Sequence, residues 1–135
     1  MTGGGVIGIG VDLVEIERMH SALERWGPRF QERIFGPEER RYCESRPAPW
    51  RHYAARFALK EAVGKAFGTG IGAEIGWLDI ETVRAKTGAP SVALSGRAAA
   101  LAARRGVARV LASLAHGRAY AIAQAVLVGK EPRYP

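Results

Sequence analysis

The sequence has very little cysteine and no long apolar run. Its single cysteine, Cys43, excludes an internal disulfide and any metal site built from several cysteines. Because no stretch reaches the roughly 20 apolar residues that span a bilayer, we expect no membrane partner. The glycine-rich first residues also lack the basic and apolar segments of a secretion signal, so we expect a cytoplasmic protein.

What is present is typical of one soluble globular domain. The chain has 135 residues, of which 47% are apolar and 24% are charged. We therefore predict a single domain over residues 1–128, followed by a flexible tail at 129–135 that contains charged residues and proline.

Basic residues outnumber acidic ones and give a formal net charge of +7. More than half of them lie between Arg18 and Lys65. This excess favours an anionic partner such as a nucleic acid, a phosphate-bearing cofactor or an acidic protein, and charge alone does not choose among the three.

Helices are predicted mainly in the first half of the chain. Apolar residues at three- and four-residue steps from Leu13 to Trp26 are typical of an amphipathic helix, which Gly27 and Pro28 would end. Gly68 is placed to terminate the strongest helix. The elements expected in this half are a strand at 6–11 and helices at 13–26, 37–46 and 50–67.

Strands are predicted mainly in the second half. The glycine-rich segment 68–72 should be a flexible loop, and the turn at 87–90 should join a hairpin. The expected elements are strands at 78–86 and 91–94, a helix at 96–105, and strands at 107–114 and 119–128. This order predicts an α+β fold in which helices, mostly from the first half, pack on a mainly antiparallel sheet.

Two carboxylates occupy informative positions. Asp12 directly follows the first predicted strand, and Glu61 lies in the middle of the strongest helix. Mg²⁺ is commonly held by one or two carboxylates and takes further oxygens from substrate phosphates, so this pair would suit it. The residues alone also allow Asp12 to be a helix cap and Glu61 to be a solvated helical residue.

The helix around Glu61 carries charges at regular spacing. Glu61 and Lys65 share a face, and Arg56 and Lys60 form the adjoining stripe. A carboxylate one turn from an ammonium suits a metal and a phosphate oxygen side by side. The same spacing suits an ordinary helical ion pair, and spacing does not separate the two.

Three motifs carry a family resemblance. Gly8–Arg18 (GIGVDLVEIER), Phe57–Lys65 (FALKEAVGK) and Gly68–Gly72 (GTGIG) resemble, in this order, the bacterial holo-acyl carrier protein synthase family, which has the 4′-phosphopantetheinyl transferase-like fold. Later landmarks of the family are resembled by 79–81, 88–90 and 113–116, so the likeness covers nearly the whole chain.

The resemblance implies a transferase of fatty acid biosynthesis. It would move 4′-phosphopantetheine from coenzyme A to a serine of apo-acyl carrier protein, giving holo-carrier and adenosine 3′,5′-bisphosphate. The family also implies a homotrimer with active sites between subunits. Ala115 and Gly117 flank His116, whereas the family tends to carry Ser or Thr before this histidine and a side chain after it.

The resemblance assigns roles to particular residues. Asp12 and Glu61 would be the Mg²⁺ ligands and, with Lys65, the catalytic residues. The coenzyme A contacts would be Arg56, Lys60, Lys65, Gly68, Gly70 and His116. The arginines facing the acidic carrier would be Arg18, Arg25, Arg29 and Arg33. From its sequence context alone, a histidine between two strands also suits a structural hydrogen bond.

Two other functions remain open from the residues. A basic nucleic-acid-binding domain would use the positive charge, but the aromatic residues fall where helices need core contacts instead of alternating with basic ones. A non-catalytic module that binds coenzyme A or the carrier would be indicated by loss of Asp12, Glu61 or Lys65, and all three are present.

Overall fold

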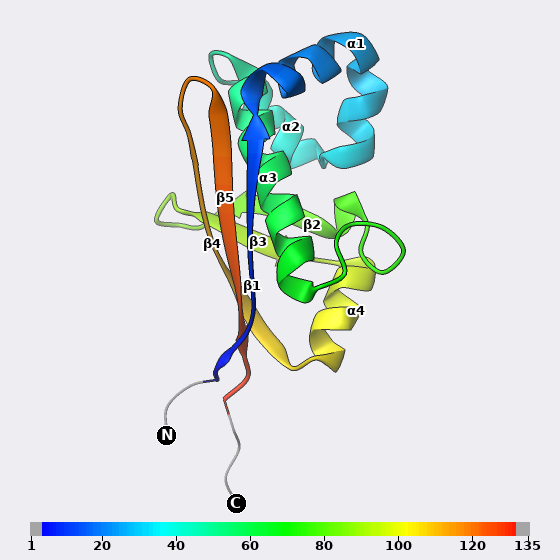
Figure 1. The fold of residues 1–135 in the computed structure, drawn as a ribbon, viewed down its shortest axis with the longest axis vertical. Helices are drawn as coiled ribbons and strands as arrows, with labels where there is room; N and C mark the ends of the chain where they lie inside the picture. Colours follow the sequence, from blue (N-terminus) through cyan, green and yellow to red (C-terminus); the bar gives the residue numbers. More distant parts are fainter. Residues whose placement is uncertain (1–3, 132–135) are drawn as a thin grey trace, which may run out of the picture.

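A computed structural model describes residues 4–131. Its centre is an antiparallel sheet in the order β1 (Val6–Glu15), β5 (Tyr120–Gly129), β4 (Val107–His116), so the first and last strands are neighbours. The long helix α3 (Pro49–Phe67) runs along one face of this sheet (Figure 1). The predicted α+β class with an antiparallel sheet is confirmed.

The remaining elements surround α3 (Figure 1). They are α1 (Ile16–Ile34), α2 (Pro37–Glu44), the 3₁₀ helix η1 (Trp77–Asp79), β2 (Ile80–Arg84), β3 (Pro90–Leu94) and α4 (Gly96–Arg104). Strands β2 and β3 form the predicted antiparallel hairpin. No helix within residues 4–131 has the length and apolar character needed to cross a bilayer.

The first strand is longer than predicted. It continues to Glu15, so Asp12 lies within β1 opposite Ala123 and not after its end. Leu13 is consequently an exposed strand residue and not part of the predicted helix, which begins at Ile16. Because Glu15 occupies the N-cap of α1, the interpretation of Asp12 as a helix cap is wrong.

The predicted break in the first helix is confirmed. Gly27 has a φ of 62°, a left-handed conformation that glycine adopts without strain, and it divides α1 into two helical segments before Pro28. Trp26, predicted to face the core, is exposed. The second segment contributes Ile34 to a core cluster that also contains Phe35 and Tyr53.

Other boundaries shift by a few residues. Leu78 is exposed in η1, and the strand predicted to begin there begins at Ile80. At the other end, Gly129 still belongs to β5 and the Lys130 N–H donates to the Gly106 carbonyl. The predicted tail therefore starts too early, and its residues 132–135 lie outside the described ones.

Glycines allow α3 to approach the sheet closely. A Cβ atom on Gly8 would lie 2.0 Å from the Ala66 carbonyl oxygen, and one on Gly10 would lie 2.0 Å from that of Ala62. The buried positions of β5 that face the same way are mostly alanine, at residues 121, 123 and 125. The sheet thus meets the helix through very small residues.

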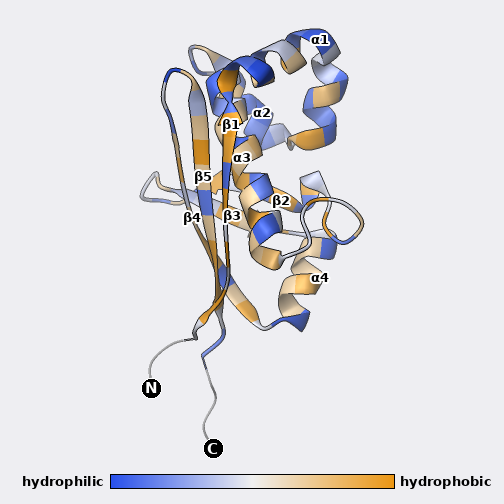
Figure 2. Ribbon diagram, viewed as in Figure 1, coloured by the Kyte–Doolittle hydropathy of each residue, from blue (hydrophilic) through white to orange (hydrophobic). Residues whose placement is uncertain are grey.

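The opposite face of the sheet is apolar and exposed. Its exposed large side chains include Ile9, Val11, Leu13, Leu111 and Ile122. Orange segments mark apolar residues along β1 and β5 (Figure 2). Among residues 4–131 no helix lies on this face, whereas exposed apolar surfaces of this kind commonly mark interaction sites.

Candidate functional site

The close contact between β1 and α3 brings Asp12 to Lys65. The Lys65 Nζ donates to Asp12 Oδ1 at 2.8 Å and to the Val11 carbonyl oxygen at 3.1 Å. The Asp12 side chain is mostly covered, while about half of the Lys65 side chain is exposed. The hydrogen bond to Asp12 raises the pKa of Lys65, because it stabilises the charged ammonium.

Glu61 lies on α3 one turn before Lys65 and faces the same strand. Burial raises the pKa of Glu61, the negative charge of Asp12 raises it further, and Lys65 acts in the opposite direction. Within residues 4–131, Lys65 forms its ion pair with Asp12 and none with Glu61. The ordinary helical Glu61–Lys65 pair is therefore not what the structure contains.

The donor set at this position fits a hard divalent cation. Two carboxylates converge, and their mutual repulsion is relieved only partly by one lysine. Residues 4–131 contain no cluster of three or more potential metal-binding side chains. A cation held here by the chain would have two protein carboxylates and would take its remaining oxygens from water or phosphate, which suits Mg²⁺.

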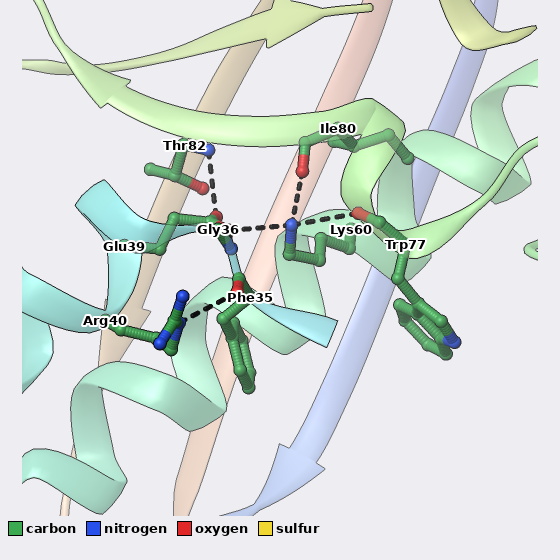
Figure 3. Close-up of polar contacts among 8 residues, drawn as sticks. All are labelled: Phe35, Gly36, Glu39, Arg40, Lys60, Trp77, Ile80 and Thr82. Carbon is green, nitrogen blue, oxygen red and sulfur yellow. Dashed lines mark hydrogen bonds and ion pairs between the residues drawn. The ribbon is translucent and has the colours of Figure 1, made fainter. Parts of the chain in front are cut away.

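Lys60 is not available to a ligand, contrary to the sequence-based expectation. Its side chain is fully buried and its ammonium lies 2.8 Å from Glu39 Oε1. It also donates to the carbonyl oxygens of Trp77, at 3.0 Å, and Ile80 (Figure 3). All three donors of the ammonium are used inside the protein, so the prediction that Lys60 contacts coenzyme A is wrong.

Arg56 and His116, far apart in the sequence, line one pocket of about 370 Å³. Arg56 is buried, with only 6% of the residue exposed, and its guanidinium lies 4.2 Å from the Tyr42 ring centroid. Its Nε has no hydrogen-bond partner in the described part of the chain. An unsatisfied buried cation of this kind favours an anionic ligand.

The same pocket contains residues that the sequence did not indicate. Tyr42 is also contacted by the guanidinium groups of Arg46 and Arg84, and its hydroxyl accepts a hydrogen bond from Arg84. His52 lies against His116, with ring centroids 5.0 Å apart. Burial lowers the pKa of His52, and the nearby His116 and Arg56 lower it further.

The pocket and the carboxylate pair lie on different sides of α3. Arg56 and Glu61 are five residues apart, which places them about 140° apart around a helix. Across residues 4–131 of one chain, the two groups therefore project from different sides of the helix.

The glycine-rich loop after α3 folds back onto the helix. Gly68 and Gly70 have φ values of 80° and 66°, and the Gly70 N–H donates to the Gly64 carbonyl at 3.0 Å. The loop has no regular structure, as predicted, and it begins three residues after Lys65.

The four arginines predicted to meet a partner all lie on α1, in its two segments. Arg18 and Arg25 line one surface hollow with Glu15 and Glu17. Arg29 and Arg33 line a second with Trp26 and Phe30, so apolar rings lie beside positive charges there.

Comparison with known proteins identifies the family to which this chain is similar. A family model described as the 4′-phosphopantetheinyl transferase superfamily matches residues 8–125. A holo-[acyl-carrier-protein] synthase of Desulforudis audaxviator is 51% identical over 92% of this chain and 94% of its own length. One of Ruminiclostridium cellulolyticum is 47% identical over 88% of this chain and 90% of its own.

Solved structures agree as well. The holo-[acyl-carrier-protein] synthase of Helicobacter pylori in complex with coenzyme A is 34% identical, with a TM-score of 0.79 over 88% of this chain and 98% of that one. The synthase from Neisseria meningitidis is 29% identical, with a TM-score of 0.84 over 91% and 98%. On sequence and fold together, this chain belongs to the 4′-phosphopantetheinyl transferase superfamily.

Proposed function

We propose that this chain transfers 4′-phosphopantetheine from coenzyme A to a serine of an apo-acyl carrier protein. The observation that carries the proposal is the convergence of Asp12 and Glu61 beside Lys65. The relatives named as holo-[acyl-carrier-protein] synthases, one of them solved with coenzyme A, support the same reaction.

Asp12 and Glu61 would hold Mg²⁺. When bound, the ion supplies charge stabilisation for the diphosphate of coenzyme A and for the departing oxygen. The raised pKa of Glu61 supports this role, because a cation between the two carboxylates would remove the repulsion that raises it.

Lys65 would bind the phosphate oxygens. Its Nζ now neutralises Asp12, and its half-exposed position leaves it free to turn toward a diphosphate seated above the two carboxylates. In the reaction the serine oxygen bonds to the phosphorus that carries the pantetheine arm, and the bond to the bridging oxygen breaks. The serine proton is released, and adenosine 3′,5′-bisphosphate leaves with the electron pair. Lys65 stabilises the charge that develops on the phosphoryl oxygens.

The pocket around Arg56 would bind the nucleotide end of coenzyme A. Arg56, Arg84 and His116 line this pocket; all three offer hydrogen-bond donors and the two arginines add positive charge, which suits the 3′-phosphate of the ribose. Gly68 and Gly70 would let the loop backbone lie against the diphosphate next to Lys65.

The arginines of α1 would receive the acidic carrier. Arg18, Arg25, Arg29 and Arg33 would steer it electrostatically, and Trp26 and Phe30 would add apolar contact. Because exposed charges are screened by salt, carrier affinity should fall as ionic strength rises.

The active form would be a homotrimer with sites between subunits. The exposed apolar face of the sheet supports burial against other copies of the chain, and the separation of Arg56 from Glu61 supports a site that two copies complete. Ile122→Arg should convert the assembly into single chains, as measured by light scattering. A single-chain mass for the unaltered protein would contradict this assembly.

The cellular setting follows from the reaction. Carrier proteins need the pantetheine arm before they can hold acyl chains, so we place the reaction in fatty acid biosynthesis in the cytoplasm.

Mass spectrometry of the carrier tests the proposal directly. The protein, coenzyme A and Mg²⁺ are incubated with an apo-carrier, whose intact mass should increase by one phosphopantetheine group. Asp12→Ala and Glu61→Ala should each abolish the gain, while Glu131→Ala, an exposed acid at the end of the described chain, should not.

The same assay separates the rival functions. Binding of coenzyme A by the unaltered protein without a mass gain would indicate a non-catalytic binding module. Retention on DNA with neither coenzyme A binding nor mass gain would indicate a nucleic-acid-binding domain.

A further inference from the structure

The buried ion pair between Glu39 and Lys60 is the most completely satisfied polar cluster around α3. Lys60 makes the three contacts given above, and Glu39 accepts from the Gly36 N–H and the Thr82 N–H, each at 3.0 Å (Figure 3). Both side chains are essentially without solvent exposure. The pair connects α2, α3, η1 and the start of β2.

The surroundings of the pair fix its orientation. Two backbone N–H groups face the carboxylate of Glu39, and two backbone carbonyls face the ammonium of Lys60. Exchanging the two charges would therefore leave four backbone groups facing the wrong partner. An arrangement of this kind selects one placement of α3 relative to β2.

The sheet side of α3 provides much weaker control over helix rotation. There the helix backbone contacts Gly8 and Gly10, and the facing residues of β5 are alanines at 121, 123 and 125, with Leu127 beyond them. Small residues permit close approach, but they offer few protruding side chains that would resist a roll of the helix about its axis. Directional hydrogen bonds on the other side would supply that resistance.

Lys60 and Glu61 are consecutive residues, so their side chains leave the helix about 100° apart. Any roll of α3 that moves Lys60 moves Glu61 by the same angle. For an atom about 6 Å from the helix axis, a roll of about 10° is a displacement of about 1 Å. Misplacement on that scale reduces catalysis by about 100-fold in well-organised sites.

We propose that Glu39 and Lys60 are positioning residues, which fix the rotation of α3 and thereby hold Glu61 opposite Asp12. The inference rests on the proposed function, because it assigns the pair a role in the same metal and coenzyme A site. Neither residue touches the substrate; both act through Glu61.

The test replaces the pair by neutral residues of similar size. In the double variant Glu39→Gln/Lys60→Met, the glutamine amide can still accept from a backbone N–H and can donate to a carbonyl that Lys60 vacates. Removing both charges avoids an unpaired buried ion, so this variant should fold. If it does not, the single variant Glu39→Asp, which keeps both charges and only shortens the carboxylate side chain, is measured in its place.

Tyr53→Phe is the matched control. Tyr53 is also buried on α3, two turns before Lys60, and its hydroxyl donates to Glu44 of α2 at 2.8 Å. The substitution thus removes a polar link between the same two helices without involving the residue next to Glu61. Thermal unfolding of both variants gives the loss of stability against which binding is compared.

Calorimetric titration with coenzyme A and Mg²⁺ is the primary measurement, with the KM for Mg²⁺ as the second. The double variant should bind Mg²⁺ with coenzyme A roughly 10- to 100-fold more weakly and show a raised KM for Mg²⁺. Tyr53→Phe should bind Mg²⁺ with coenzyme A as tightly as the unaltered protein does, even if it lowers the Tm by as much as the double variant.

Two results overturn the inference. If the folded double variant binds Mg²⁺ with coenzyme A within about twofold of the affinity of the unaltered protein, the positioning role is rejected and the proposed function is unaffected. Absence of any binding by the unaltered protein contradicts the proposed function, and the inference falls with it. The two failures are therefore distinguishable.

Discussion

Lys60 and Lys65 lie five residues apart on α3 and meet opposite surroundings. The side chain of Lys60 has no exposure and its three donors all have partners inside the protein, whereas 51% of the Lys65 side chain is exposed. Lys65 faces two carboxylates, so the charges around it do not balance. A buried group whose hydrogen-bond donors all have partners inside the protein stabilises the fold. A surface group whose neighbouring charges do not balance is placed to bind a charged ligand.

The largest expected effect is on stability at Lys60. Lys60→Ala leaves the Glu39 carboxylate buried without a counter-charge and should lower the free energy of unfolding by about 3–5 kcal/mol. Urea denaturation followed by circular dichroism measures this. The exposed Lys86→Ala should stay within about 0.5 kcal/mol of the unaltered protein. If Lys60→Ala lowered the free energy of unfolding no more than Lys86→Ala does, the structural role of Lys60, and with it the contrast to Lys65, would be contradicted.

Lys65 should show the converse behaviour. Lys65→Met should change the free energy of unfolding by less than about 1 kcal/mol, because its ion pair with Asp12 is half-exposed. It should lower the rate of carrier modification about 100-fold, since it removes positive charge from the phosphoryl oxygens. Steady-state kinetics measures the rate. A variant that keeps more than about a tenth of the activity would argue against the phosphate contact.

A third substitution examines the pocket on the other side of α3. Arg56→Leu should raise the KM for coenzyme A by about tenfold or more, because a charged hydrogen bond is lost. Coenzyme A without its 3′-phosphate should be used equally by the variant and the unaltered protein. The exposed Arg51→Leu is the control. If Arg56→Leu weakened both substrates alike, the pocket would not recognise the 3′-phosphate.

The smallest effect concerns Glu61 and pH. Burial and Asp12 raise the pKa of Glu61, so its ionised form destabilises the fold at neutral pH. Glu61→Gln should therefore raise the Tm, by about 2 °C at pH 7, while abolishing activity. As the pH falls through the raised pKa, Glu61 of the unaltered protein becomes protonated and neutral, like the glutamine. The difference in Tm between the two proteins should therefore shrink. Differential scanning fluorimetry across pH 4–8 measures it; an equal or growing difference at low pH would contradict this explanation.

The sequence predicted most elements because their periodicity is local. Helix α3 and the β2–β3 hairpin appeared close to their predicted bounds. The predicted end of β1 was wrong because Leu13 and Ile16 fit both a helical and a strand pattern. In addition, apolar residues of the strand such as Leu13 lie on the exposed face of the sheet. A local pattern does not reveal that the outer face of a sheet is apolar.

The sequence predicted the site residues that lie within recognisable motifs, but not the residues that contact them from distant parts of the chain. Asp12, Glu61 and Lys65 do come together, and Arg56 and His116 do share a pocket. The burial of Lys60 depends on Glu39 of α2, and the pocket depends on Tyr42 of the same helix and on Arg84 of β2. These partners have no fixed spacing in sequence, so only the folded chain identifies them.

The glycines at residues 8 and 10 set the width of the gap between the two acids. Asp12 follows Gly10 by two residues along the strand, and Glu61 directly precedes Ala62, whose carbonyl would clash with any Cβ on Gly10. A single added methyl group would push strand and helix apart and would widen the gap by the same displacement. If Asp12 and Glu61 hold a cation as proposed, the absence of a side chain at Gly10 would therefore limit the size of the ion that fits between them.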